Sequence, residues 1–592
     1  MMFDGDRTSG YDSVVSRRRF LAATGAAGAT AIAGCSDDAQ TGGEGDEDTD
    51  GDVVDRADAW FATAQVEHQV QQFQYNQNVW GGSTHASFGL FSEYTQYLIG
   101  EDEFHPHFVE DWEVGDTTMT LQLRDDFTWG NGDDITADDV VMQLEIQEYL
   151  GESLWDFAED ATAVDDTTVE ISYPEGTNLD IIQHSVLHNT LDHPPADFSD
   201  AHEAIRNGED ADLFFEIEEP TPSGPIGLAD TSSSYHEYEI RDDHPLAGNY
   251  NWNGYRMGYR DSNTSAHQSF AAGELDGIHS LFADPGTMEQ FSDSLEEIQI
   301  PGMFGFAIVF NHADEHYGER AVRKAFMYAI DESQVIDNVG ASTKIDFDAP
   351  VGLTAAGIDS WLGDSIDEYE SYDQDLDRVE ELLTDAGFER NDDDVWERDG
   401  QTLEAPVIAP ASWSDWALTA STIVDQLSQA GFDASEDMRE GGAWGEAAAN
   451  GDFKVIAEEH TEGGDPANNY PFFSLRYKFL NDKHGDESYF NYPEEVTVPA
   501  RDGDGEVTVD FRDTFEEFAT TNDEDRIQEL VEQLAWVFNQ DLPLGMVQEK
   551  QEQSFLSRHG WEFPDQSEHF QTFWPMWWLP KVDELKATSN AE

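Results

Sequence analysis

The sequence of 592 residues contains a single cysteine, Cys35, so no disulfide can form within the chain. Basic residues are also scarce: 29 Lys and Arg stand against 126 Asp and Glu, and the formal net charge is −97. Because phosphate contacts need clustered Lys and Arg, this composition argues against binding to nucleic acid. Beyond Cys35, no apolar run approaches the ~20 residues of a membrane-spanning helix. Because no disulfide can form, the body of the chain must be stabilised by packing.

The excess of acidic residues predicts a protein that folds in concentrated salt. A net charge this far from zero destabilises a compact state by self-repulsion at ordinary salt. At molar salt the Debye length falls to about 3 Å, which screens most of that repulsion. The alternative, a disordered acidic chain, is disfavoured because 39% of the residues are hydrophobic and 12% are aromatic. We therefore expect the protein of an extreme halophile.

The N-terminus has the features of an export signal. Residues 16–22 read SRRRFLA, in which Arg17 and Arg18 form a twin-arginine address for the export of folded proteins. A weakly apolar stretch follows and is too short for a stable membrane span. It ends in Ile-Ala-Gly-Cys35, which resembles a lipobox whose cysteine is acylated and becomes the new N-terminus. The alternative is a chance arginine run and a buried cysteine, but the order of the parts predicts a signal peptide over 1–35 and a lipid anchor on the outer face of the membrane.

The segment after the cysteine is predicted to be a tether. Residues 36–52 read SDDAQTGGEGDEDTDGD and hold no apolar residue larger than alanine. Such a segment cannot bury enough surface to fold, and its like charges extend it. We expect 36–57 to be an acidic, disordered tether between the membrane and the folded body.

Strand and helix signals alternate from about residue 58 to the end, which indicates an α/β body. Residues 108–123 are typical of a hairpin, because two alternating runs flank Gly-Asp. Thr136 and Asp139 form a start resembling a capping box. The run 304–311 predicts a buried strand, and 319–330 an amphipathic helix with one buried face.

The second half of the chain adds further helices and turns. Two predicted helices end at Gly387 and Gly431, where a left-handed C-cap belongs. The acidic stretch 391–400 indicates a hairpin loop, and 523–539 a long amphipathic helix. A two-lobed body of this size would place a ligand between the lobes.

Several sequence blocks, taken in order, carry a resemblance to a known family. They read DWEVGDTTMTLQLRDDFTWGNGDDITADDVV, AAGELDGI, FNHADEHYGERAVRKAFMYAIDESQVI, DLDRVEELLTDAGF, QLSQAGFDAS, AWGEAAANGDFKVIAEEHTEGGDPANNYPFF and NQDLPLGMV. The chain resembles the extracellular solute-binding proteins of family 5, the peptide- and nickel-type binders of ABC importers, in a haloarchaeal form. The resemblance runs from about residue 58 to the C-terminus.

The resemblance implies a fold and a partner. The fold would be α/β and two-lobed, like a periplasmic binding protein of class II, cluster C type, with an additional sub-domain. Lobe I would cover 58–302 with the sub-domain inserted at about 96–210, lobe II would cover 303–558, and 559–592 would return to lobe I. Ligand would be buried by closure of the lobes about a hinge. We expect a monomer without a cofactor that delivers a small solute to an ABC permease.

The resemblance also assigns two acidic residues to the ligand. Peptide binders of this family hold the amino group of the ligand with an Asp in a segment resembling Asp-x-x-Asp-Pro. Here the segment reads EGGDP, so Glu462 takes the amine-pairing place and Asp465 lies nearby. The alternative is that both are ordinary surface acids in a chain rich in them.

Two tryptophans mark a departure from the family pattern. Dipeptide-type relatives hold the ligand carboxylate with an Arg at a place where this chain has Trp413, in APASWSDW, with no Arg nearby. That departure disfavours a short free peptide. Trp413 and Trp416 could instead stack on the rings of a sugar, which makes a carbohydrate receptor the alternative function. Core packing is the other interpretation of both side chains.

One pattern would favour an enzyme. His312, Glu315 and His316 match the inverted zincin motif, in which two His on one helix face share zinc and the Glu acts as base. The motif lies between a predicted strand and a predicted helix, where a loop is expected. We therefore keep a zinc peptidase as a remote alternative and expect no catalytic residue and no metal. The sequence favours a lipid-anchored receptor for an oligopeptide-like solute that is not an enzyme.

Overall fold

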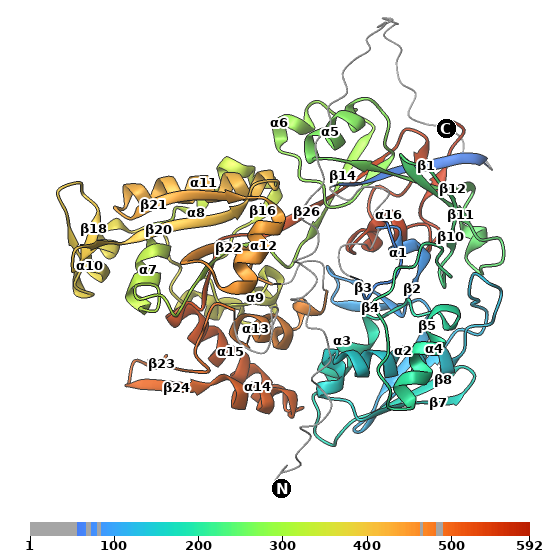
Figure 1. Cartoon of the computed structure of the whole chain (residues 1–592), viewed down its shortest axis with the longest axis horizontal. Coiled ribbons are helices and arrows are strands. Elements are labelled where there is room, and N and C mark those ends of the chain that lie inside the picture. Colours follow the sequence, from blue (N-terminus) through green and yellow to red (C-terminus); the bar gives the residue numbers. More distant parts are fainter. Residues whose placement is uncertain (1–55, 67–72, 80–84, 462–465, 481–488, 592) are drawn as a thin grey trace, which may run out of the picture.

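Two α/β bodies lie beside each other and are linked by strands that pass from one to the other (Figure 1). We call the body built on the sheet of strand β1 lobe I, the attached residues 94–206 the sub-domain, and residues 306–546 lobe II. The computed structural model describes residues 56–66, 73–79, 85–461, 466–480 and 489–591. Within these ranges no helix is long and apolar enough to cross a membrane.

Lobe I is built on a four-stranded sheet that includes the first described strand and packs against the C-terminal tail. Its order is β1 (Arg56–Val66), β12 (Trp252–Arg260), β11 (Tyr235–Ile240) and β10 (Ile226–Thr231), with β1 parallel to β12. The aromatic C-terminal tail returns to this core, where Trp561 packs on Phe61 and Trp577 on Tyr255. Short helices surround the sheet: α1 (Ser87–Leu90), α5 (Asn263–Ala271), α6 (Pro285–Met288) and α16 (Pro575–Trp578).

The sub-domain is a second four-stranded sheet covered by helices. The order is β5 (Val109–Val114), β6 (Thr118–Leu123), β8 (Thr168–Ser172) and β7 (Asp160–Asp165), all antiparallel. The predicted hairpin of 108–123 is confirmed as β5 and β6. The predicted helix start is also confirmed, because Thr136 N donates to Asp139 Oδ2 over 2.9 Å. Helices α2 (Ala137–Leu150), α3 (Leu179–Leu187) and α4 (Pro195–Arg206) and the hairpin β3 (Thr95–Leu98)–β4 (Glu103–Pro106) complete it.

Lobe II is organised around a five-stranded mixed sheet. The order is β21 (Asp433–Arg439), β20 (Glu404–Pro410), β22 (Val455–Glu459), β15 (Phe306–Phe310) and β25 (Leu544–Met546). Strand β15, predicted as a buried strand, is buried at all five residues. Phe306, Ile308 and Phe310 pack into the core on one face of the sheet, while Ala307 and Val309 pack into the core on the other. The alternation of a strand thus builds two cores from one apolar run.

Helices cover both faces of the lobe II sheet (Figure 1). The predicted helices are confirmed as α7 (Arg320–Tyr328), α10 (Leu376–Asp385), α11 (Ser414–Gln429) and α15 (Glu524–Asp541). Gly387 and Gly431 follow α10 and α11 with φ of 87° and 88°, the left-handed conformation expected of a C-cap. The stretch 391–400, predicted as a hairpin loop, instead holds strand β18 (Trp396–Arg398) between two turns, and β18 pairs with β17 (Glu389–Arg390) and β19 (Gln401–Thr402). The remaining elements are α8 (Glu332–Val339), α9 (Ala355–Trp361), α12 (Gly441–Asn450), α13 (Pro471–Leu480), α14 (Phe511–Ala519), β23 (Glu495–Pro499) and β24 (Glu506–Asp510).

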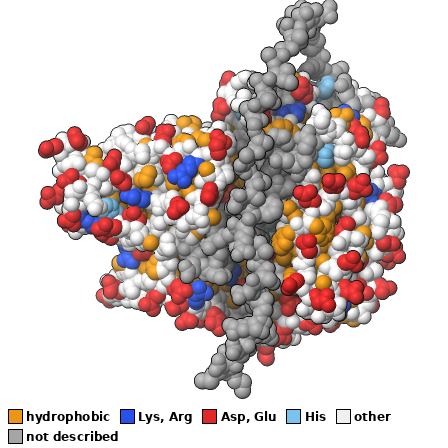
Figure 2. All heavy atoms as spheres, in the orientation of Figure 1, with side chains coloured by type: hydrophobic (Ala, Val, Ile, Leu, Met, Phe, Trp, Pro, Cys, Tyr) orange, Lys and Arg blue, Asp and Glu red, His pale blue; other side chains and the backbone are white. Residues whose placement is uncertain are grey.

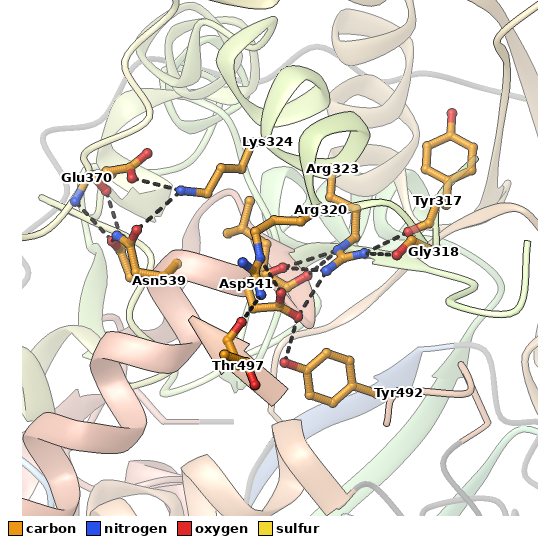
Figure 3. A network of polar contacts seen from close by, with 12 residues as sticks. Tyr317, Gly318, Arg320, Arg323, Lys324, Glu370, Tyr492, Thr497, Asn539 and Asp541 are labelled. Carbon is orange, nitrogen blue, oxygen red and sulfur yellow. Dashed lines mark hydrogen bonds and ion pairs between the residues drawn. The ribbon is translucent and has the colours of Figure 1, made fainter. Parts of the chain in front are cut away.

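A buried polar network ties α7 to the end of α15 (Figure 3). The Arg323 guanidinium donates to Asp541 Oδ2 over 2.9 Å and to the backbone oxygen of Asp541 over 2.7 Å. Tyr492 donates its hydroxyl to the same carboxylate over 3.0 Å, and Arg320 pairs with it from the rim. Burial by itself would raise the pKa of Asp541, but Arg323 and then Arg320 outweigh it and hold that pKa below its ordinary value.

Candidate functional site

The two lobes are joined by two adjacent strand crossings. One runs from β14 (Leu295–Pro301) to β15, and the other from β25 to β26 (Glu549–Ser557). Gly302 N donates to Lys550 O over 2.9 Å and Lys550 N to Phe304 O over 2.7 Å, so the crossings are bonded to each other. At Gly305 a Cβ would lie 2.1 Å from the backbone oxygen of Gln548, which excludes any side chain there. The connection between the lobes is therefore a paired, closely packed ribbon, which we call the hinge.

Ion pairs with little exposure flank this ribbon. Lys344 Nζ lies 2.6 Å from Asp415 Oδ2, at 2% and 8% exposure, and Lys550 Nζ lies 3.3 Å from Glu552 Oε1. Ser280 donates to Glu552 Oε1 over 3.2 Å from lobe I. Burial alone would raise the pKa of Asp415 and of Glu552, but the nearby lysine ammonium groups hold both below their ordinary values. The carboxylates of Asp415 and Glu552 therefore stay ionised at neutral pH.

A second buried cluster lies on the lobe II side of the hinge. We call Lys478, Glu549 and His460 the hinge cluster; all three are fully buried. Lys478 Nζ donates to Ser474 O over 3.0 Å, and Glu549 Oε2 accepts from Ala355 N over 2.9 Å. Burial raises the pKa of Glu549 to about 7 and lowers that of Lys478 to about 7, so desolvation outweighs their mutual attraction.

The hinge cluster has hydrogen-bonding capacity that the described protein does not use. In the described ranges, Glu549 Oε1 and His460 Nε2 are buried atoms without a hydrogen-bond partner. A buried polar atom left unpaired costs about 1–3 kcal/mol. These two unpaired atoms beside the strand crossings mark the hinge cluster as a candidate binding site.

The sequence-predicted acids belong to the segment that leaves this cluster. Glu462 and Asp465 lie outside the described residues, so their assignment stays a prediction. The chain that leads to them is fixed at the hinge: His460 N donates to Gly305 O over 3.0 Å, and Thr461 Oγ1 donates to Met303 O over 3.0 Å. The segment therefore begins beside the hinge cluster.

The two predicted tryptophans are brought together with a third. The rings of Trp413 and Trp416 meet edge to face with centroids 5.1 Å apart, and Trp444 lies 5.2 Å from Trp413. Trp416 is 4% exposed and packs on Phe306 in the lobe II core, whereas Trp413 is half-buried. Of the two, Trp413 has the more accessible ring, and a role of either in binding stays a prediction.

The zincin-like motif lies in the connection between β15 and α7, as the sequence predicts, and not on a helix. The His312 Nε2 atom lies 2.8 Å from the backbone oxygen of Pro543, and burial lowers the pKa of His312 to about 3. Among the described residues no group of three or more His, Cys, Asp or Glu side chains is arranged to hold a metal ion. The helical geometry on which the remote peptidase alternative depends is therefore not formed.

Sequence reasoning missed the hinge cluster. A signal for it was present, because lysine is rare in this chain and Lys478 interrupts the apolar run PFFSLRYKFL of α13. Glu549 opens a strand that reads EKQEQSFLS, in which polar residues stand at positions that the sheet buries. Polar residues in buried elements are more informative in this chain than its many surface acids.

Comparison with known families decides the relationship. The family of bacterial extracellular solute-binding proteins, family 5 (middle region), matches residues 103–479. The chain belongs to this family. Family 5 membership agrees with the ordered sequence blocks, which begin within the matched region, at residue 111, and extend beyond its C-terminal end to residue 547. No match was found among curated proteins.

Solved structures show the same fold at low sequence identity. An oligopeptide-binding protein of an ABC transporter from Thermotoga maritima, with bound mannohexaose, is 17% identical, with a TM-score of 0.71 over 90% of this chain and 98% of that one. NikZ from Campylobacter jejuni, with Ni(L-His), is 15% identical, with a TM-score of 0.67 over 89% and 99%. AppA from Bacillus subtilis, with a nonapeptide, is 15% identical, with a TM-score of 0.65 over 90% and 100%. The expected α/β, two-lobed binding-protein fold is thereby confirmed.

Proposed function

We propose that this family 5 protein is the solute-binding receptor of an ABC importer and captures an oligopeptide-like solute between its lobes. The observation that carries the proposal is the hinge cluster: buried polar atoms with unused bonding capacity, placed where two lobes meet at a paired-strand hinge. A solute bound there contacts both lobes and favours the closed form, which a permease can recognise. Similar proteins have been solved with a nonapeptide, mannohexaose or Ni(L-His).

Within this proposal, Glu462 pairs with the amino group of the peptide and Asp465 supports it. The acidic segment begins one residue after Thr461, beside the hinge cluster. A second candidate is an oligosaccharide, favoured by the half-buried ring of Trp413 at the head of α11, with Trp416 packed behind it. A division of the chain into 58–302 with 559–592 and 303–558, as the resemblance implies, is part of the same proposal, with β26 (Glu549–Ser557) at the junction of the two parts.

We further propose that the protein works outside the cell of a halophile. The twin arginines at 17 and 18 direct export, and Cys35 carries a lipid that holds the monomer near its permease. Figure 2 shows carboxylates spread over the visible face of both lobes, with few basic side chains among them. Such a surface suits molar salt, where its self-repulsion is screened.

A ligand screen in molar KCl tests the proposed function. The purified protein is heated with pools of oligopeptides, oligosaccharides or nickel salts, and the unfolding temperature is recorded. A bound ligand stabilises the folded state by about 2.7 kcal/mol at a hundredfold excess over Kd. We expect a shift with one peptide pool. A shift with oligosaccharides alone would replace the peptide by the sugar candidate.

Single substitutions then test which residue contacts the ligand. Glu462→Gln should weaken binding of the peptide by about 1.5–3 kcal/mol, the scale of a hydrogen bond to a charged group. Glu494→Gln, an exposed acid on the same lobe, is the matched control. Equal peptide affinity of both variants would remove Glu462 from the site. For a sugar, Trp413→Ala should be the more damaging change.

A further inference from the structure

A separate cavity lies between the sub-domain and lobe II. Its volume is about 440 Å³, which suits a large side chain rather than a bare ion. The sub-domain supplies Asp102, Trp112 and Asp180, and lobe II supplies Trp361 and Asn469. Helix α3, whose first turn carries Asp180, lies next to α13 in Figure 1, and Asn178 in its cap is bonded to Tyr470 over 3.0 Å. The sub-domain and lobe II therefore both form walls of the cavity.

One hydrogen-bond acceptor at the cavity wall has no donor in the described part of the chain. Asn469 Oδ1 is a buried atom that has no hydrogen-bond partner among the described residues, while its Nδ2 donates to Tyr97 over 2.8 Å. His184 is 7% exposed, and its Nδ1 is engaged with His188 at 3.2 Å. No bond of His184 Nε2 to another described residue is formed. The unused Asn469 oxygen at the cavity wall calls for a ligand that donates.

The cavity carries negative charge that the protein does not neutralise. Asp102 and Asp180 are exposed at the cavity, and no Lys or Arg of the described chain forms an ion pair with either. Burial raises the pKa of Asp180, the hydrogen bond from Tyr470 offsets part of this rise, and the charge of Asp102 adds to it. A cation placed at the cavity would offset the negative charge of these two carboxylates.

Aromatic rings form the remaining wall. Trp361 meets Tyr470 edge to face at 6.0 Å, and Trp112 meets Phe104 edge to face at 6.4 Å. Tyr470 also stacks on His184 at 5.4 Å. The faces of tryptophan rings attract organic cations, and Arg most often. Acceptors, carboxylates and aromatic faces are thus combined around one cavity.

We propose that this cavity is a binding site for a guanidinium or primary ammonium group. The N–H groups of such a cation donate to Asp102, Asp180 and Asn469 Oδ1, and its flat or alkyl part lies against Trp112 and Trp361. A metal ion fits the site less well, since no group of three or more His, Cys, Asp or Glu side chains suited to a metal occurs in the described part of the chain. Because both bodies contribute, the bound cation favours their contact.

The cation has two sources, and the experiment separates them. One is a free small amine or guanidine. The other is an Arg or Lys side chain of the captured peptide, and this second source rests on the proposed function. The probes are N-acetyl-arginine amide and N-acetyl-citrulline amide, which differ in charge and hardly in shape. A peptide from the ligand screen is then compared in arginine and citrulline forms.

Titration calorimetry of the full chain in molar KCl measures the outcome. We expect the arginine amide, or the arginine form of the peptide, to bind about 10-fold or more tightly than its citrulline counterpart. Asp180→Asn should remove this difference, and Trp361→Ala should reduce it. Asp392→Asn, at an exposed turn after β17, is the matched control and should leave it unchanged.

The cation site and the proposed function can fail separately in this experiment. Discrimination by the free amides assigns the site to a free cation, and discrimination only within peptides assigns it to a side chain. Equal binding of the arginine and citrulline forms in both pairs overturns the cation site, even when the peptide binds well. Unchanged discrimination in Asp180→Asn, with an unfolding temperature like that of the wild type, overturns it as well.

Discussion

The guanidinium of Arg323 and the carboxylate of Asp541 face each other inside lobe II, 2.9 Å apart and at 2% and 5% exposure. Without Arg323, the buried Asp541 keeps only Arg320 at the rim as a cationic partner in the described chain, and loss of one partner of a buried pair costs about 3–5 kcal/mol. We therefore expect Arg323→Met to lower the free energy of unfolding by that amount, measured by denaturant titration in molar KCl. Arg378→Met, which breaks an exposed pair with Glu381, should cost at most about 1 kcal/mol. Equal unfolding midpoints for the two variants would show that the buried Arg323–Asp541 pair contributes no more stability than the exposed Arg378–Glu381 pair.

Salt should stabilise the folded chain over a wide concentration range. The formal net charge of −97 repels itself most strongly at low ionic strength. Raising KCl from about 0.1 M to 1 M shortens the Debye length from about 10 Å to 3 Å and screens that repulsion. We expect the unfolding temperature, followed by circular dichroism, to rise steadily over this range. An unfolding temperature that is constant or falls with KCl would contradict the halophilic interpretation.

The hinge cluster should make stability depend on pH in two opposite ways. The folded pKa of Glu549 is raised to about 7, so the unfolded state loses this proton first. As pH rises toward 7, the wild type therefore loses stability relative to Glu549→Gln, which does not titrate. Denaturant titrations of both proteins between pH 5 and 8 measure this difference. Glu389→Gln, at an exposed position of β17, is the matched control and should follow the wild type.

Lys478 should act in the opposite direction above neutrality. Its folded pKa is lowered to about 7, so between pH 7 and 10 the unfolded state binds the proton and the folded state does not. Stability of the wild type relative to Lys478→Met should therefore rise with pH over this window. A difference between the two proteins that is flat from pH 7 to 10 would show that Lys478 is charged in the folded state.

Local sequence patterns predicted several of the elements, because these elements are fixed by neighbours along the chain. The alternation of residues 306–310, the capping box at Thr136 and the glycines at 387 and 431 each specify one element without reference to the rest. The ordered blocks then predicted the family and the two-lobed fold. Such signals are strong where burial follows a simple period.

The hinge cluster could not be predicted in the same way. Lys478 and Glu549 lie 71 positions apart in sequence on α13 and β26, and no local pattern brings them together. The abundance of acids also hides functional carboxylates, since any segment of this chain contains several. Glu462 and Asp465 were selected by resemblance alone, and Trp416 shows that a selected aromatic can be largely enclosed by the core.

The contact between the sub-domain and lobe II should contribute to solute affinity. Asn178, fully buried, caps α3 with Oδ1, while its Nδ2 donates across to Phe518 O over 3.2 Å and to Tyr470 over 3.0 Å. Ser caps a helix equally well but is too short for the crossing bonds. Asn178→Ser should therefore keep α3 and weaken the contact, so that solute affinity falls about 3- to 10-fold. Thr136→Ser, a cap exchange in α2, is the control and should not change the affinity. Small-angle scattering of the liganded proteins should show a more open average shape for Asn178→Ser only. Identical affinities and scattering curves for both variants would show that this contact persists whether or not solute is bound.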